Sequence, residues 1–289
     1  MANQIVSLSY KFRIFPSRAQ TAKLENTLNL CRDLFNCALQ ERRDAYRLNR
    51  VSINYYDQAN QLSHIKITNP EYKDIHSQVL QDVLKRLDKS FQGFFRRIKQ
   101  NVKSGFPRFQ GKFKYNSFTY AQSGFALESG KLSLSKIGKI KIKLHREIIG
   151  KVKTLTVLRD SCGKWFVYFS VETTREILEP TNKNIGIDLG IKTFCTLSDG
   201  TEIANPRFFR QDEKILATAQ RKLSKQPKGI KERYKKRKIV AKIHNKIKNR
   251  RSNFAHQVSS FLVKNYQNIF FENLNIKGMM KNHCLAKAI

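Results

Sequence analysis

The chain has 289 residues, with 56 Lys+Arg against 22 Asp+Glu and a formal charge of +34 at pH 7. A hydrophobic fraction of 40% and an aromatic fraction of 11% exclude a disordered basic tail, and no apolar run reaches the ~18 residues of a transmembrane helix. The charge predicts a polyanionic partner, nucleic acid first and an anionic membrane surface second.

The first expected element is a half-buried strand over 5–14, where apolar and polar residues alternate. Pro16 ends this strand, and Ser17 is the expected N-cap of a helix. From there to about residue 100 the apolar spacing is helical, with a break at Asn69-Pro70. The helical stretch ends in a basic run with interleaved phenylalanines, which suits phosphate contacts and base stacking, although these rings could equally be core. The expected nucleic-acid-binding residues of this run are Arg96, Arg97, Lys103 and Arg108.

Short strands are expected from about 117 to 175. In the run 133–148, the apolar residues Ile140, Ile142 and Leu144 alternate with Lys139, Lys141 and Lys143, so one strand face is apolar and the other is a row of lysines. This row fits either phosphate tracking along an RNA helix or a solvated edge strand that lysines protect. A hairpin is expected around 161–163. With strand 5–14, these strands predict a small β-barrel that closes across the helical insert.

Beyond a junction at Glu179-Pro180, the sequence predicts three short strands with a tight turn at Asp199-Gly200. Residues 214–251 carry sixteen Lys/Arg and one carboxylate, and their apolar spacing predicts a helix despite the break at 227–229. A second helix, 254–265, leads into the apolar strand NIFFENL. The basic residues of the first helix that we expect to bind nucleic acid are Arg233, Lys235, Lys236, Arg237, Lys242, Lys246, Arg250 and Arg251.

Two carboxylates lie within apolar strands. Asp188 lies in IGIDLG and Glu272 in IFFENL, where an acid is costly unless it binds a cation or hydrogen-bond donors. On neighbouring parallel strands, the two could bind Mg²⁺ for phosphodiester displacement. Taken singly, each could also be an ordinary carboxylate at a strand end.

In combination, the segments resemble TnpB, the OrfB-type family of insertion sequences and relative of type V CRISPR effectors. The resemblance is carried by FFRRIKQNVKSGFPRFQGKFKY, LSLSKIGKIKIKLHREI, GKWFVYFSVE, NIGIDLGIKTFCTLSDG, the basic helix and IFFENLNIKGMMKNHCLAKAI. It implies a fold of the α+β multidomain class, with a barrel that contains a helical recognition insert and then a RuvC nuclease domain of RNase H-like fold. The implied division is 1–15 for the first barrel strand, 16–105 for the insert, 106–178 for the rest of the barrel and 179–289 for an incomplete RuvC-like domain.

The resemblance also implies function. The family uses a guide RNA from its own element and cuts double-stranded DNA beside a short motif. Asp188 matches the first RuvC acid and Glu272 the second, which implies that both are catalytic and bind Mg²⁺.

The chain departs from the family pattern after HCLAKAI, where the family continues with two cysteine pairs that hold zinc and with a third catalytic Asp. Neither is present, and Cys284 has no partner pair. We therefore expect a C-terminally truncated copy without zinc, which cleaves DNA poorly or not at all.

Two alternatives stay open. One is a non-catalytic protein that binds RNA and DNA without cutting. The other is an ATPase of the actin or sugar-kinase fold, which IGIDLG also opens, although the other glycine loops of that fold are absent here. We expect no membrane association, and the absence of a signal-peptide pattern predicts a cytoplasmic protein.

Overall fold

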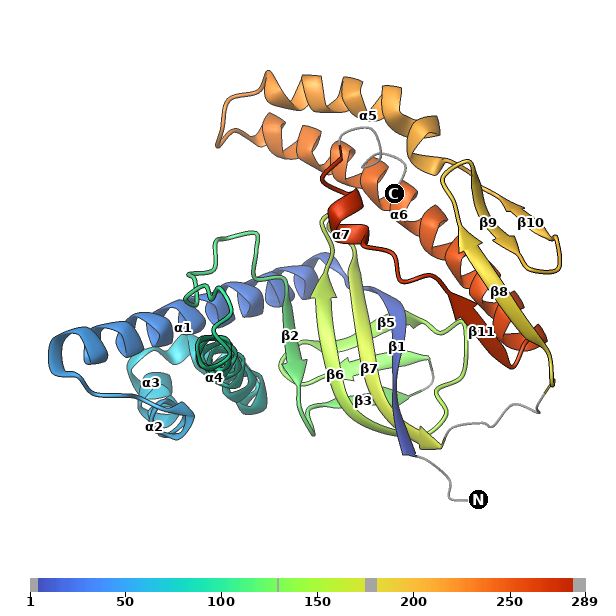
Figure 1. Ribbon diagram of the computed structural model, residues 1–289. Coiled ribbons are helices and arrows are strands. Elements are labelled where there is room, and N and C mark those ends of the chain that lie inside the picture. The colour runs from blue at the N-terminus through green and yellow to red at the C-terminus, as the bar shows by residue number, and fades with distance from the viewer. Residues whose placement is uncertain (1–4, 129, 175–180, 283–289) are drawn as a thin grey trace. The chain divides into compact units, whose positions relative to one another are not determined.

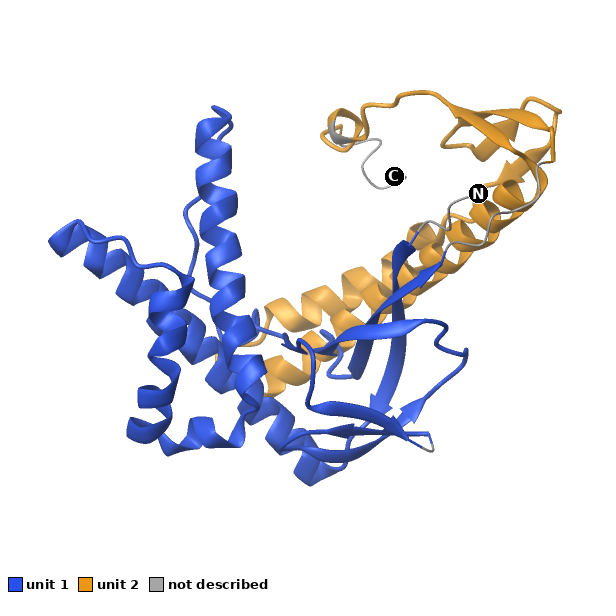
Figure 2. Ribbon diagram, turned by 90° about the horizontal axis from the view of Figure 1, so that it is seen from below, with its two compact units in different colours: residues 1–175 blue, residues 176–289 orange. Residues whose placement is uncertain are grey.

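The computed structural model describes residues 5–128, 130–174 and 181–282, and the chain forms two compact units, residues 1–175 and 176–289 (Figure 2). Both units mix helices and strands, so the expected α+β class is confirmed. The junction expected at Glu179-Pro180 lies outside the described residues, and the four-part division of the chain stays a prediction. No described helix is long and apolar enough to cross a lipid bilayer.

The first unit is built on a seven-stranded antiparallel sheet in the order β2-β6-β7-β1-β5-β4-β3 (Figure 1). The strands are β1 (Ile5–Phe15), β2 (Ser117–Tyr120), β3 (Phe125–Glu128), β4 (Lys131–Leu134), β5 (Gly138–Lys143), β6 (Lys151–Arg159) and β7 (Trp165–Thr174). The edge strands β2 and β3 approach each other through Tyr120 and Phe125, whose ring centroids are 6.5 Å apart. The sheet is therefore nearly closed, in agreement with the expected small barrel.

Strand β1 occupies the centre of this sheet. Its residues 5–14 pair with residues 165–174 of β7, and residues 13–15 pair with 141–143 of β5. The inward side chains Tyr10, Phe12 and Ile14 are buried, and the side chains between them point outward. The sequence alternation that predicted a half-buried strand is confirmed.

The helices of the first unit follow β1 in the chain. They are α1 (Arg18–Asn49), α2 (Tyr55–Asn60), α3 (Leu62–Thr68), the short 3-10 helix η1 (Pro70–Asp74) and α4 (Ser77–Lys99). Ser17 caps α1, because its hydroxyl accepts the Gln20 N–H while the Gln20 side chain accepts the Ser17 N–H. A buried arginine joins three of the helices: Arg42 of α1 donates to Gln58 of α2 at 2.8 Å and to Asp88 of α4 at 3.1 Å.

The second unit contains a four-stranded mixed sheet in the order β10-β9-β8-β11 (Figure 1). Its elements are β8 (Asn184–Leu189), β9 (Thr193–Leu197), β10 (Glu202–Ala204), α5 (Phe208–Ser224), α6 (Lys231–Asn265), β11 (Asn268–Phe271) and α7 (Ile276–Met279). Ile185 and Ile187 of β8 pack with Leu197 and with Leu262 of α6 in a small core. Strand β11 pairs with β8 in parallel.

The helix boundaries expected in the basic region are wrong. One helix was expected over 214–251 and another over 254–265, but α5 ends at Ser224 and α6 runs without a break to Asn265. Pro227 has no N–H to donate and Gly229 has a φ of +92°, so the chain leaves the helix between 225 and 230. No Pro or Gly lies between 251 and 254, and the helix continues there.

Candidate functional site

The parallel pairing of β8 and β11 gives the two candidate carboxylates corresponding positions on neighbouring chain segments. The last paired positions are 187 and 271, so the next residues, Asp188 and Glu272, follow in the same register. At the other end of this pair, Asn268 Nδ2 donates to Asn184 Oδ1 at 2.8 Å, which shows that side chains in register share one face. Since side chains alternate along a strand, Asp188 lies on the Asn184 face of the sheet, opposite the core.

Both carboxylates are exposed and can reach a ligand from solvent. Mg²⁺ in proteins is commonly bound by one or two carboxylates, with water and substrate phosphates in the other positions, so these two side chains fit that ion. Among the described residues, no group of three or more His, Cys, Asp and Glu side chains could hold a metal. A Mg²⁺ ion at Asp188 and Glu272 would have two carboxylate ligands, with water and substrate in its other coordination positions.

The turn after Asp188 is fixed by close backbone packing. A Cβ at Gly190 would lie 2.8 Å from the carbonyl oxygen of Thr193, so a larger residue does not fit there. Asn205 Nδ2 donates to the Ile191 carbonyl at 2.9 Å, and its Oδ1 accepts the Arg207 N–H at 3.0 Å. These contacts tie the β8–β9 turn to the start of α5.

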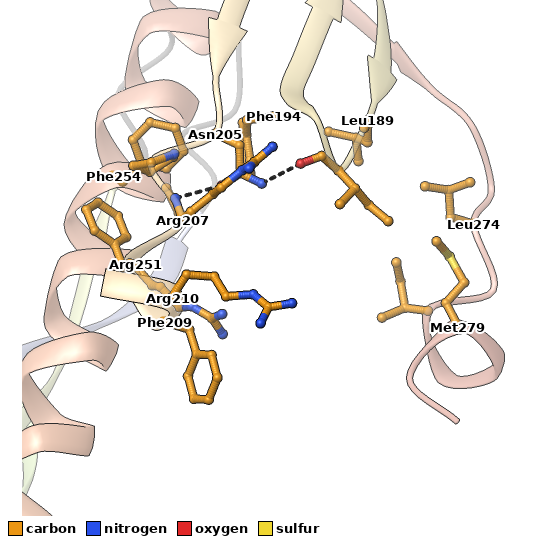
Figure 3. Close-up of a pocket in the computed structure, with 16 residues that line it drawn as sticks. Leu189, Phe194, Asn205, Arg207, Phe209, Arg210, Arg251, Phe254, Leu274 and Met279 are labelled. Carbon is orange, nitrogen blue, oxygen red and sulfur yellow. Dashed lines mark hydrogen bonds between the residues drawn. The ribbon is translucent and has the colours of Figure 1, made fainter. Parts of the chain in front are cut away.

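A pocket of about 550 Å³ lies beside this turn (Figure 3). Leu189 lies at its edge next to Asp188, and Leu274 comes two residues after Glu272. Figure 3 shows three arginines on the helical side of the pocket, opposite Leu274 and Met279. The arginines are Arg207, Arg210 and Arg251, and the phenylalanines of the pocket are Phe194, Phe208, Phe209 and Phe254.

Sequence reasoning expected Arg251 to bind nucleic acid but missed Arg207 and Arg210. The available signal was the run PRFFR, which combines two arginines and two phenylalanines directly after the third strand of the unit.

An ion pair that the sequence did not suggest holds α5 against α6. Asp212 of α5 is only 4% exposed and accepts Lys246 Nζ and Arg250 Nη1 of α6, each at 3.1 Å. Burial of this acid beside two cations neutralises part of the charge of α6. Two of the expected nucleic-acid-binding residues therefore have a structural partner.

Other basic residues of α6 also have partners within the unit. Arg233 donates to the Leu223 carbonyl at 3.1 Å and to the Gln226 carbonyl, near the C-terminal end of α5. Lys235 and Lys236 pair with Glu232 at 3.3 and 3.5 Å. Arg237 and Lys242 are exposed on the surface of α6.

The basic aromatic run after α4 is partly anchored. Arg96 and Arg97 lie in the last turn of α4, and Lys103 and Arg108 are exposed in the irregular segment that follows. Asn36 of α1 exchanges two hydrogen bonds with the Gln110 backbone, at 3.0 and 2.8 Å.

The phenylalanines of this run are neither fully core nor free. Phe106 packs edge-on against Phe91 and Phe94, with centroids 5.5 and 5.3 Å apart, yet it is 45% exposed. The run therefore presents aromatic and cationic groups together from an anchored segment.

The three lysines of β5 point outward, away from the buried Ile140 and Ile142. Strand β5 lies between β1 and β4, so the alternative of a protected edge strand is wrong. Lys11 of β1, which was not predicted as a binding residue, has its Nζ 4.4 Å from the ring centroid of Phe166 on the same outer face. The feature of the sequence that could have indicated Lys11 is the alternation of basic and apolar residues in strand 5–14. Cys284, on which the expected absence of zinc rests, lies outside the described residues.

Two sequence profiles of known protein families match parts of this chain. A family profile described as "Probable transposase" (OrfB of IS605) matches residues 152–283, and one described as "Helix-turn-helix domain" (also OrfB of IS605) matches residues 1–50. Within residues 1–50, however, the described residues form strand β1 and one helix, α1, rather than the two helices of a helix-turn-helix.

Two curated proteins align with nearly the whole chain. "Putative RNA-guided DNA endonuclease" of Streptomyces pristinaespiralis is 34% identical over 99% of this chain and 71% of its own length. "Putative RNA-guided DNA endonuclease InsQ" of Escherichia coli K12 is 32% identical over 95% of this chain and 68% of its own length. Among solved structures, a Cas12f1–sgRNA–target DNA complex matches with a TM-score of 0.54 at 12% identity, over 93% of this chain and 81% of that one. At this identity the match is one of fold alone.

Proposed function

Because this chain belongs to the TnpB/OrfB family of insertion-sequence proteins, we propose that it is an RNA-guided DNA endonuclease whose cleavage site is formed by Asp188 and Glu272. The observation that carries this proposal is the parallel register of β8 and β11, whose last pair, Ile187 and Phe271, directly precedes the two acids in the chain. Family membership sets aside the ATPase alternative.

The two carboxylates would hold Mg²⁺, which when bound supplies charge stabilisation to a phosphodiester undergoing displacement. The protein would contribute position, because each acid directly follows the last residue of the β8–β11 pairing, and the contacts of Gly190 and Asn205 hold the loop beyond Asp188. We further propose that this unit is of the RuvC type, with the acid-bearing β8 at the interior of its mixed sheet.

A guide RNA and a DNA target are the proposed partners. For binding their phosphates we propose the anchored aromatic run after α4, the outward lysines of β5 and the exposed basic residues of α6. Each phosphate neutralised steepens the dependence of log affinity on log salt by about 0.7–0.9, so RNA binding by this surface depends strongly on salt.

Cleavage by this chain is proposed to be weak. Two carboxylates leave the geometry of attack under-determined, and among the described residues no third metal-binding side chain joins them. The same observation favours a second candidate function, in which the chain holds RNA and DNA without cutting.

The first test measures metal binding, because the affinity for a metal ion tests the site independently of how fast the chain cleaves DNA. We expect Asp188→Asn and Glu272→Gln to weaken Mn²⁺ binding, measured by electron paramagnetic resonance, by about tenfold, since each removes one of two charged ligands. Glu202→Gln is the matched control, an exposed acid of the same sheet outside the site. Equal Mn²⁺ affinity in Asp188→Asn and Glu202→Gln would refute the site.

The second test is cleavage of a plasmid library by the chain purified with RNA transcribed from its own locus. We expect bound RNA and slow, Mg²⁺-dependent cutting that Asp188→Asn abolishes. Rapid cutting by the unaltered chain would refute the proposed weakness, and RNA binding without any cutting would favour the second candidate function.

A further inference from the structure

An apolar groove lies between α5 and α6 on the surface of the second unit. The two helices are antiparallel neighbours (Figure 1), joined at one end by the ion pair between Asp212 and Lys246 and at the other by the hydrogen bond from Arg233 to the Leu223 carbonyl. Between these contacts the helices leave a cavity of about 440 Å³. The Thr218 hydroxyl in its lining donates to a carbonyl of its own helix, at 3.0 Å, so it is not available to a ligand as a donor.

The floor of the groove is aliphatic, and the spacing of residues in α6 explains why. Ile239, Ile243 and Ile247 recur every four residues and therefore form one stripe along the helix. Ile247 is buried, whereas Ile239 is 46% exposed, so the stripe runs from the interior of the helix pair onto its surface. Ile215, which is 58% exposed, and Ala219 line the groove from α5. An apolar patch of this kind is typical of a binding site for a partner.

Lysines surround this apolar floor. Lys214, Lys222 and Lys236 line the groove, and no acidic residue is among the described residues that do. Lys236 pairs with Glu232 at 3.5 Å, whereas no described carboxylate pairs with Lys214 or Lys222. An aliphatic floor with cationic edges is complementary to a ligand that carries an apolar stripe between negative charges.

This chemistry selects among the possible ligands. Nucleic acid supplies negative charge, but its bases stack on aromatic rings, and the described lining of the groove is aliphatic. A second copy of the chain has the same charge of +34 and would bring further cations to the lysines. We propose that the groove binds an acidic amphipathic helix of a partner protein, with aliphatic side chains at i, i+3, i+4 and i+7 in the groove and carboxylates facing the lysines.

The dimensions of the groove determine the expected strength of binding. Its lining on α5 extends from residue 214 to residue 222, which corresponds to about 12 Å along the helix axis, or about two turns. An interface of this length belongs to the small, transient class of protein contacts. The proposal does not depend on the cleavage site, because a chain that never cuts DNA can still bind such a helix.

The test uses a fluorescent peptide of about 18 residues, long enough to form a helix, with a stripe of leucines at i, i+3, i+4 and i+7 and glutamates on both sides of it. A second peptide has the same composition, with its leucines spread around the helix. Binding to the full chain is followed by anisotropy at physiological salt, where the attraction between exposed charges is screened. We expect the striped peptide to bind about tenfold more tightly, because its leucines leave water together in the groove.

Two pairs of variants locate the binding site. Ile239→Asp should weaken binding of the striped peptide about tenfold, since it removes an apolar contact and adds like charge. Val263→Asp is its matched control, because Val263 is 51% exposed on the same helix, lies outside the groove lining and gives the same change of charge. Lys222→Gln should weaken binding about threefold, the contribution of an exposed ion pair. Lys264→Gln, at an exposed lysine of α6 outside the lining, should leave the affinity unchanged.

Equal binding of the two peptides would overturn the proposal without any variant, because the attraction would then be one of charge alone. Equal losses in Ile239→Asp and Val263→Asp, each with its fold checked by circular dichroism, would also overturn it. The lysine pair gives the same decision if Ile239→Asp does not fold. If Ile239→Asp weakens binding of a DNA duplex as much as binding of the peptide, the groove is a nucleic-acid surface. If the variant instead abolishes self-association of the chain in sedimentation, the groove binds a second copy, and in either case the proposal is wrong.

Discussion

Replacing the buried Arg42 by alanine should destabilise the first unit by about 3 kcal/mol, near the lower end of the range for breaking a buried ion pair. The guanidinium donates to Gln58 at 2.8 Å and to Asp88 at 3.1 Å, and it lies 5.2 Å from the ring centroid of Phe91. Removing it leaves the Gln58 oxygen, on a side chain that is almost wholly buried, without this donor. Asp88 is partly exposed and regains some hydration, which keeps the loss from being larger.

The assay is urea or thermal unfolding followed by circular dichroism. For a unit of 175 residues, about 3 kcal/mol corresponds to a fall in Tm of about 6–12 °C. Arg47→Ala is the matched control, because Arg47 lies on the same helix, is largely exposed and pairs with Asp44 at 3.4 Å; its loss should be below about 0.5 kcal/mol. If Arg42→Ala and Arg47→Ala unfold at the same temperature, the buried network contributes nothing and the reasoning is wrong.

Three further predictions concern the turn, the thiols and pH. Gly190→Ala should lower the stability of the second unit, seen as earlier unfolding, because its Cβ would lie 2.8 Å from the Thr193 carbonyl; an unchanged unit would contradict the packing. Burial raises the pKa of the Cys31 thiol to about 12, so at pH 8 a thiol reagent should modify the exposed Cys37 and spare Cys31 until the chain unfolds; equal rates in the native protein would count against this. Burial and, secondarily, nearby lysines lower the pKa of His76, so folding favours its neutral form. The contribution of His76 to the free energy of unfolding should therefore be fully present above its ordinary pKa of 6.5 and be lost as the pH falls below that value. His76→Gln should flatten that part of the profile in acid-unfolding curves, and an unaltered slope would show that other groups cause it.

The elements that the sequence predicts correctly are those with a local signal. The alternation in 5–14 and the cap at Ser17 need only neighbouring residues, and both are present. The pairing of β1 with β7 has no local signature, since it joins residues about 160 positions apart. The boundary error in the basic region arose because helical spacing continues on both sides of 225–230, and there the missing N–H of Pro227 outweighs the periodicity.

For the candidate site, the sequence predicted two acids on neighbouring parallel strands, and the β8–β11 pairing has this form. That expectation was possible because each acid interrupts a strongly apolar run. The burial of Asp212 could not be predicted, because it depends on how α5 packs on α6, and an acid in a basic helix gives no sign of its partners. The roles of the acids and of the basic residues stay predictions until the variants above are measured.

The central position of β1 has a consequence for synthesis of the chain. Strand β1 leaves the ribosome before the other described elements, but its long partner β7 ends at Thr174, so full pairing of β1 requires about 160 residues of further translation. At typical rates of 5–20 residues per second, this interval is about 8–30 s, during which most of β1 lacks its β7 partner, and only residues 13–15 gain a partner earlier, in β5. Helices α1 to α4 emerge in that interval and are stabilised by contacts close in sequence, so they can fold first and shield the nascent strand. We therefore expect the long insert between β1 and β2 to fold before the sheet, whose central strand β1 completes its pairing late.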